Sequence, residues 1–290
     1  MSKQSTFVQD VDEQANRGSA SLSAQMYASC SNCKERLQGE FCHNCGQKHI
    51  DHHDYSLKAF ASHGLHEILH FDSKVFRTLV PLMFKPGYLT EEYFSGKRMR
   101  YLKPLQLFIL INVLFFLVKT GGLFHYSLTA YLNEFGNLIQ ARINSSGLSE
   151  TVYEAKFNTS MHFQQKSYII LLVPVFALAM KLLYLRAKRY YVEHLVFSLN
   201  FFAFFLVFLA VFPIPLIALK LLGVKVSVGE RPLVAVIFIV CSIYLSIALK
   251  RVYKQKIPAT LLKAFILAAC VIPLILFYRI VLFFVVLHTT

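Results

Sequence analysis

The chain has 290 residues, of which 56% are hydrophobic and only 16% are charged. Soluble proteins carry about one quarter charged residues, so this composition excludes an ordinary soluble domain with a single buried core. The formal net charge is +14, but most of the basic residues border hydrophobic runs, where they can face anionic headgroups. We therefore expect a membrane protein with membrane lipids as partners, and no nucleic-acid partner.

Residues 1–29 are polar and rich in Ser, Gln and Asp. They contain no apolar stretch of the kind that a signal peptidase requires. We predict that they form a disordered leader.

Four cysteines follow as two Cys-x2-Cys pairs with an eight-residue spacer: Cys30, Cys33, Cys42 and Cys45. Each pair can form a knuckle whose sulfur atoms converge on one metal ion, and the spacer lets the second knuckle fold against the first. Four thiolates suit Zn²⁺ best, with iron as the main competitor. A redox-active pair usually occurs singly within a βαβ pattern, which is missing here. Because sulfur fills all four positions, residues 30–47 are predicted to form a zinc ribbon with one structural zinc per chain.

A histidine-rich helix is expected next, beginning near Ser56. Residues 66–70 read His-Glu-Ile-Leu-His, a pattern in which His66 and His70 bind zinc and Glu67 activates water. Seven of the eleven histidines lie between residues 43 and 70, so chance matches are enriched there, and no typical third ligand follows. We favour a solvated polar helix face and keep a zinc metallopeptidase as an alternative.

Two further segments lead to the membrane. Residues 75–83 suit a helix at the membrane interface, ended by Pro86-Gly87. Residues 90–104 end in a basic run that we expect to anchor the chain at the membrane surface: Lys97, Arg98, Arg100 and Lys103. Residues 48–103 are therefore predicted to form cytoplasmic amphipathic juxtamembrane helices.

Residues 104–290 are predicted to form a helical transmembrane domain. Five runs are long and apolar enough to span a bilayer: 104–124, 167–185, 195–221, 232–249 and 264–287. The unbroken apolar stretch of the first run ends at Lys119, so residues 121–124 would have to complete its crossing. The predicted fold class is an all-α multipass membrane protein with about five transmembrane helices, a small N-terminal four-cysteine zinc ribbon and juxtamembrane amphipathic helices.

The distribution of basic residues predicts an orientation. With a cytoplasmic N-terminus, the inner borders of the spans carry thirteen Lys and Arg residues, against seven in the outer loops. Because short cytoplasmic loops are enriched in Lys and Arg, we predict a cytoplasmic N-terminus, an extracytoplasmic C-terminus and an extracytoplasmic loop at 119–166. Apolar residues at helical spacing in this loop would lie on the membrane surface or cap the bundle: Tyr131, Leu132, Phe135, Leu138, Ile139 and Ile143.

Several sequence motifs between residues 30 and 118 follow one another in an order that resembles a known protein family. The paired cysteines with their Gly-Gln ending precede FDSKVFRTL at 71–79 and KPGYLTEEYFSGKRMRYLKP at 85–104. This order resembles an uncharacterised bacterial family of inner-membrane proteins with an N-terminal zinc ribbon and a domain of unknown function. The resemblance implies zinc at the four cysteines and a bacterial inner membrane, but no activity, because the family has no settled function.

The leading hypothesis is a non-enzymatic membrane protein whose cytoplasmic ribbon is a docking or assembly module, with a protein partner or self-assembly through the ribbon. A transporter or channel component is the first alternative, since it requires polar groups at membrane depth. The candidates for such groups are Gln106, Asn112, Lys181, Asn200 and Arg279. The metallopeptidase that would use residues 66–70 is the second alternative.

Overall fold

The computed structural model describes residues 29–49, 56–57, 74–117, 127–215, 222 and 230–290. Within these ranges the regular structure is helical, apart from two isolated β-bridges in residues 29–48. The predicted leader up to residue 28 lies outside the described residues. So does the motif at 66–70, with His66, Glu67 and His70.

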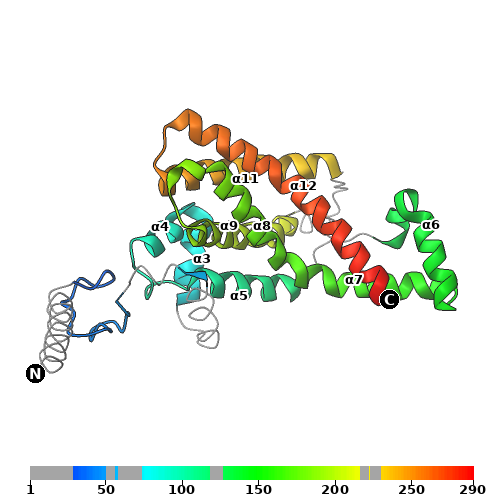
Figure 1. The fold of residues 1–290 in the computed structure, drawn as a ribbon, viewed down its shortest axis with the longest axis horizontal. Coiled ribbons are helices and arrows are strands. Elements are labelled where there is room, and N and C mark those ends of the chain that lie inside the picture. Colours follow the sequence, from blue (N-terminus) through cyan, green and yellow to red (C-terminus); the bar gives the residue numbers. More distant parts are fainter. Residues whose placement is uncertain (1–28, 50–55, 58–73, 118–126, 216–221, 223–229) are drawn as a thin grey trace, which may run out of the picture.

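Figure 1 shows the helices in chain order, with short 3-10 turns at Tyr168–Leu171 and Leu185–Ala187. Their bounds are α3 (Lys74–Phe84), α4 (Tyr88–Phe94), α5 (Pro104–Leu117), α6 (Leu128–Ser146), α7 (Glu150–Ser167), α8 (Leu172–Leu183), α9 (Tyr191–Val211), α11 (Glu230–Tyr253) and α12 (Ile257–Thr289). The predicted interfacial helix at 75–83 corresponds to α3. The predicted loop at 119–166 contains α6 and most of α7.

Three helical segments in the described part of the chain are long and apolar enough to cross a membrane: Tyr191–Pro215, Pro232–Tyr253 and Ile257–Thr289. The bent pair Glu150–Gln164 and Tyr168–Leu183 adds a fourth if it forms one span. The apolar helix Pro104–Phe115 is shorter than these. The chain therefore has the apolar helices of a membrane protein, with three or four candidate spans among the described residues. The count of five stays a prediction, because the first run continues into residues outside the described ranges.

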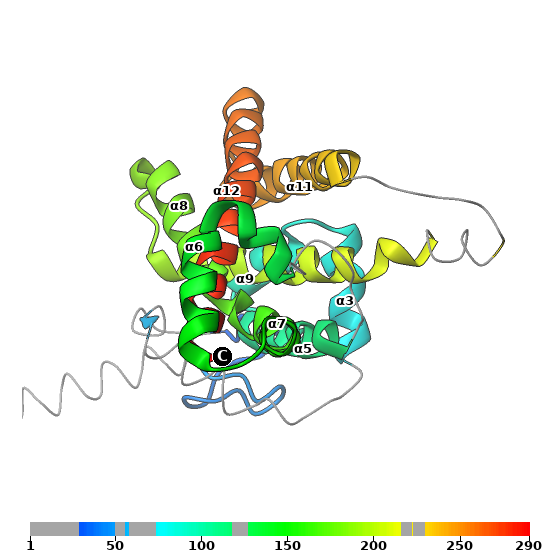
Figure 2. The ribbon, with the colours of Figure 1, turned by 90° about the vertical axis from the view of Figure 1, so that its right-hand side faces the viewer.

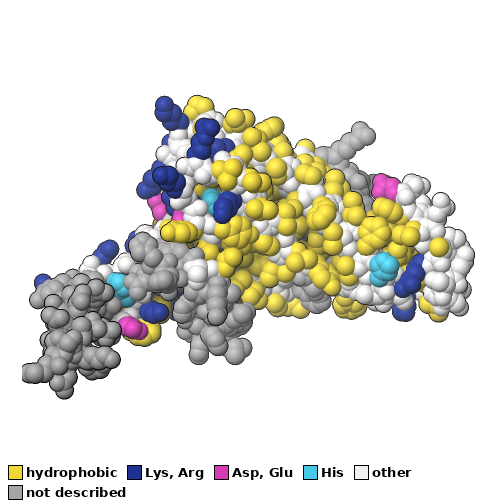
Figure 3. Space-filling view, in the orientation of Figure 1, with side chains coloured by type: hydrophobic (Ala, Val, Ile, Leu, Met, Phe, Trp, Pro, Cys, Tyr) yellow, Lys and Arg dark blue, Asp and Glu magenta, His cyan; other side chains and the backbone are white. Residues whose placement is uncertain are grey.

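Helix α9 lies at the centre of the bundle. Two thirds of its most apolar window is buried, against one third for the corresponding window of α11. Figure 2 shows α9 between α5 on one side and α11 and α12 on the other. A helix that is apolar all round belongs in such a position, whereas α11 and α12 leave apolar side chains on the outer surface. Figure 3 shows hydrophobic side chains covering the middle of one face, as expected for a surface in contact with lipid.

Helix α4 is fixed tightly between α9 and α11. Gly87 precedes it with a left-handed φ of 76°, and a Cβ atom there would lie 2.8 Å from the backbone of Ala248 in α11. In the buried interior the Asn200 side-chain amide of α9 donates a 2.9 Å hydrogen bond to the Thr90 hydroxyl of α4. Arg251 of α11 donates to the carbonyl of Pro86 at 2.9 Å. These contacts join the segment before the first apolar helix to the two helices that follow much later in the chain.

Helices α6 and α7 hold the C-terminal end of α12. Tyr131 of α6 stacks on Phe283 with ring centroids 4.6 Å apart, and Arg142 donates to the carbonyl of Leu287 at 3.1 Å. Lys156 of α7 donates to the carbonyl of Thr290 at 2.7 Å. Part of the predicted stripe packs against the bundle, since Tyr131, Ile139 and Ile143 are buried, whereas Leu132 and Leu138 are exposed. Residues 29–49 and the C-terminus lie at opposite ends of the molecule (Figure 1).

The contact between Gly87 and Ala248 predicts an unusual sensitivity to one added methyl group. Gly87→Ala introduces both a left-handed alanine, which costs roughly 1–2 kcal/mol, and an overpacked contact, which costs roughly 1–3 kcal/mol more. Gly147→Ala is the matched control, because Gly147 also has a left-handed φ, of 70°, but its Cβ would meet open space. We expect Gly87→Ala to lower the thermal unfolding midpoint of the detergent-solubilised protein clearly more than Gly147→Ala. Equal shifts would contradict the close packing of α4 on α11.

Candidate metal centre

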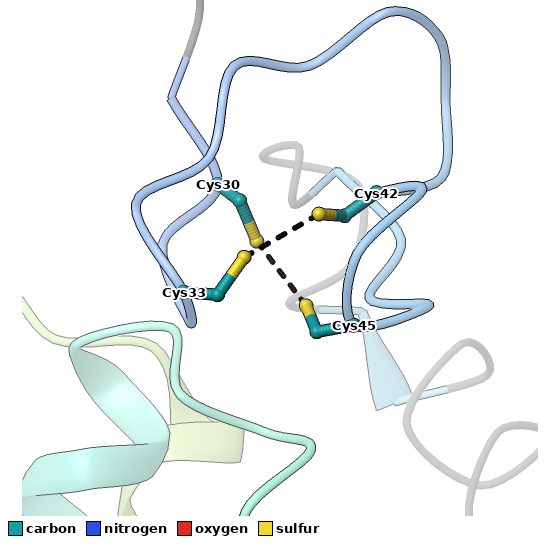
Figure 4. Close-up of side chains that lie close together, drawn as sticks. All are labelled: Cys30, Cys33, Cys42 and Cys45. Atoms are coloured by element: carbon teal, nitrogen blue, oxygen red, sulfur yellow. Dashed lines mark hydrogen bonds between the residues drawn. The ribbon is translucent and has the colours of Figure 1, made fainter.

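The four predicted cysteine ligands converge in the structure. Their sulfur atoms all lie within 4.8 Å of one another. The Sγ atoms of Cys30 and Cys45 are 3.6 Å apart, and those of Cys33 and Cys42 are 3.5 Å apart. Figure 4 shows the four side chains pointing from two loops toward one common point. A tetrahedral ion with metal–sulfur bonds of about 2.3 Å holds its sulfur ligands about 3.8 Å apart, so these four thiols could bind one metal ion with little movement.

Both knuckles have the same backbone hydrogen bonds, repeated after twelve residues. In the first knuckle the Cys30 amide donates to the Glu35 carbonyl at 2.7 Å, and the Lys34 amide donates to the Cys30 carbonyl at 2.9 Å. The second knuckle repeats these bonds at 2.9 and 2.8 Å with Cys42, Gln47 and Gly46. An isolated antiparallel β-bridge closes each knuckle, Ser29 with Arg36 and Phe41 with Lys48. The sulfur geometry is therefore set by two copies of one local turn.

Each turn requires a left-handed residue directly after its second cysteine. Gly46 has φ 72°, which glycine adopts without steric cost. Lys34 occupies the equivalent place with φ 69°, a conformation that costs a non-glycine residue about 1 kcal/mol or more. The sequence pattern marks Gly46 as a turn residue but gives no such signal at Lys34, because lysine there has no local preference for this conformation.

The knuckles enclose almost no apolar core. In residues 29–49 the buried apolar side chains are Cys30, Leu37 and Cys42, with Cys33 and Cys45 packed beside them. Burying one leucine contributes about 1.5–3 kcal/mol, whereas ordering the backbone costs about 1–2 kcal/mol for each residue. Hydrophobic burial alone therefore cannot fold this segment, and metal binding can supply the missing free energy.

The thiols are not equivalent as acids. The backbone N–H of Cys45, assisted by that of Asn44, lowers the pKa of Cys42 to about 6. At Cys33 the backbone N–H of Glu35 acts in the same direction, but desolvation and the neighbouring sulfur atoms outweigh it and raise the pKa to about 12. A metal ion must therefore displace the proton of Cys33 at neutral pH, and acidification through the pKa of Cys42 opposes binding.

One buried side chain attaches the second knuckle to the membrane-proximal segment. The Gln47 side-chain amide donates a 2.5 Å hydrogen bond to the Gly96 carbonyl, and its carbonyl oxygen accepts a 3.1 Å bond from the Arg98 amide. Gly96 has φ 85°, so the turn that presents these two groups also depends on glycine. The sequence marks Gln47 only as the end of the Gly-Gln motif and gives it no binding role. Gln47 has the same place in the second knuckle as the exposed Glu35 has in the first. No local sequence feature shows that Gln47 is buried in a contact whereas Glu35 is exposed.

The basic run expected to anchor the chain at the membrane lies directly beside this attachment. Lys97 forms a 2.7 Å ion pair with Glu92, and the guanidinium of Arg98 lies 4.5 Å from the centre of the Tyr93 ring. Arg100 is exposed, and the amide of Lys103, at the start of α5, donates to the side chain of Gln106 at 3.2 Å. Membrane anchoring by these four cations stays a prediction, and Lys97 and Arg98 also have partners within the chain.

Comparison with known proteins matches part of the chain to a protein family. The family model described as "Protein of unknown function (DUF3667)" matches residues 72–116, which contain α3, α4 and most of α5 but not the cysteines. Searches of curated proteins and of solved structures found no match. The matched region lies within the segment that carries the resemblance to a family of unknown function, and it brings no activity.

The Gln47 contacts generate a prediction about local protection. Two hydrogen bonds of about 0.5–1.5 kcal/mol each stabilise the docked turn, so Gln47→Ala should raise backbone hydrogen exchange in residues 95–100 by about tenfold. Gln38→Ala is the matched control, because Gln38 lies in the same module but is exposed. The measurement is hydrogen–deuterium exchange of the full-length protein, and metal content should stay unchanged in both variants. Unaltered exchange in Gln47→Ala would show that this side chain does not hold the two segments together.

Proposed function

We propose that the protein is a non-enzymatic multipass protein of the bacterial inner membrane, in which residues 30–47 bind one structural Zn²⁺ and act as a cytoplasmic docking or assembly module. The observation that carries this proposal is the closed set of four converging sulfur ligands on a segment fixed to residues 96–98. Four sulfur ligands leave no coordination position for water or substrate, so such a site supports structure and not catalysis.

The exposed surface of this module supports a docking role. Phe41, in the second knuckle, exposes 61% of its surface although it adjoins a metal ligand. Large aromatic side chains on a rigid support are common energetic centres of protein interfaces. The metal would hold the knuckles rigid while the Gln47 contacts hold them near the membrane. The partner would be another protein or a second copy of this chain.

The arrangement of basic residues supports a cytoplasmic N-terminus. Two basic borders contact the segment around α4. From the first, Arg189 lies 5.9 Å from the ring of Phe94. From the second, Arg251 donates to the Pro86 carbonyl and Lys254 lies 3.9 Å from Glu91. Basic residues concentrate on the cytoplasmic side of membrane proteins. The opposite end, with α6, α7 and the C-terminus, would then be extracytoplasmic.

The transporter alternative rests on polar groups at membrane depth. Several of these groups have partners within the chain: Gln106 accepts from the Lys103 amide, Asn200 donates to Thr90, and the Lys181 ammonium lies 5.9 Å from the centre of the Tyr191 ring. Asparagines within spans commonly bond across helices in this way. The metallopeptidase alternative depends on residues 66–70, which lie outside the described residues.

Three variants distinguish the contribution of the zinc from that of the partner-binding surface. Affinity purification from native membranes should recover a partner, together with zinc near a 1:1 ratio, for the wild type and for Cys270→Ser, which changes a thiol in α12. Cys42→Ser/Cys45→Ser should lose both zinc and partner, because two of the four ligands are missing. Phe41→Ala should keep zinc and lose the partner. An identical partner list from all four proteins would overturn the docking role, whereas a zinc-free wild type would overturn the metal site.

The orientation is tested by reporter fusions. Alkaline phosphatase folds only outside the cytoplasm, because it requires disulfide bonds. Fusions after residues 145 and 290 should be active, and a fusion after residue 188 should be inactive at equal expression. Activity at 188 would reverse the proposed topology.

A further inference from the structure

A cleft of about 570 Å³ opens where α4, α11 and α12 meet. Its lining includes three cations, Lys250 and Arg251 from α11 and Lys254 from the turn before α12, and one carboxylate, Glu91 of α4. Figure 3 shows Lys and Arg side chains gathered at this end of the molecule, next to the hydrophobic belt. The cleft therefore carries an excess of positive charge at the border of the apolar surface.

The cations are held in position for an anion. The Arg251 guanidinium donates to the Pro86 carbonyl at 2.9 Å and lies 3.8 Å from Glu91. Lys254 lies 3.9 Å from the same carboxylate, and 78% of its side chain is exposed. Lys250 donates to the carbonyl of Gln255 at 2.6 Å, which fixes its ammonium group beside the turn. One carboxylate therefore lies near two of the three cations, and the cleft keeps more positive than negative charge.

The other wall of the cleft is apolar. Ile247 of α11 and Ile257 and Leu261 of α12 line it, and all three side chains are exposed. They lie in the two helices that are long enough to cross a membrane. A small soluble anion would make no favourable contact with these apolar side chains. A phospholipid presents a phosphate and acyl chains side by side and could contact both walls.

We propose that this cleft binds the phosphate headgroup of an anionic phospholipid, with the acyl chains lying along the apolar residues of α11 and α12. Basic pockets between transmembrane helices recognise anionic headgroups in this way. The proposal rests on α11 and α12 crossing a membrane and is independent of the cysteine module and its metal. Free phosphate shares the headgroup chemistry, and the experiment below distinguishes the two sources.

The test is native mass spectrometry of the full-length protein, released from detergent after incubation with phosphatidylglycerol or with phosphatidylcholine of the same acyl chains. The cleft variant is Lys250→Gln/Lys254→Gln. The control is Lys188→Gln/Lys256→Gln, which removes the same charge from positions outside the cleft. Lys188 also matches the left-handed backbone of Lys254, with φ 47° against 51°.

We expect the wild type to retain phosphatidylglycerol in preference to phosphatidylcholine, and the cleft variant to lose about fivefold or more of that retention. The control variant should stay within about twofold of the wild type, and inorganic phosphate should not displace the lipid, because the acyl chains contribute to binding. Equal losses in the two double variants, equal retention of both lipids, or displacement by inorganic phosphate would overturn the proposal. If the cleft double variant does not fold, Lys254→Gln alone replaces it, since that side chain is largely exposed.

Discussion

The close approach of Gly87 to the backbone of Ala248 fixes the position of α4, and much of the described structure depends on that short helix. A side chain at residue 87 would occupy the space of the α11 backbone. With α4 held there, Thr90 meets Asn200 in the centre of the bundle and Glu91 meets Arg251 and Lys254 at the cleft. Residues 96–98, which follow directly, present the groups that Gln47 binds. One short helix thus connects the apolar bundle, the basic cleft and the cysteine module.

The cysteine module depends on a different kind of stabilisation. The apolar bundle is held by extensive side-chain packing, whereas in residues 29–49 the one buried apolar side chain besides cysteine is Leu37. Two identical turns bring the thiols together, and a bound metal would supply the free energy that burial does not. Because metal binding, and not packing, would stabilise the module, about twenty mostly polar residues can be rigid at the edge of a membrane domain. For the same reason, loss of metal would unfold the module without disturbing the packing of α9.

The local features of this architecture could be predicted from the sequence, and the distant contacts could not. The four-cysteine site follows from ligand spacing, because the backbone hydrogen bonds and β-bridges that shape each knuckle join residues at most nine positions apart. The helical stripe with Tyr131 was visible from its spacing, but its partner Phe283 was not. The bonds from Gln47 to Gly96 and from Asn200 to Thr90 join residues 49 and 110 positions apart. Polar side chains of this kind have no sequence signal that separates a buried bridge from an exposed surface residue.

We infer that a metal ion folds the cysteine module and that the folded module is fixed to the segment after α4. Hydrogen–deuterium exchange of the full-length protein, before and after removal of the metal by a chelator, tests both parts at once. Metal removal should expose the amides of residues 29–49 to exchange and should also raise exchange at residues 96–98, while residues 196–206 of the buried α9 stay protected. Full protection of residues 29–49 in metal-free protein would contradict the account.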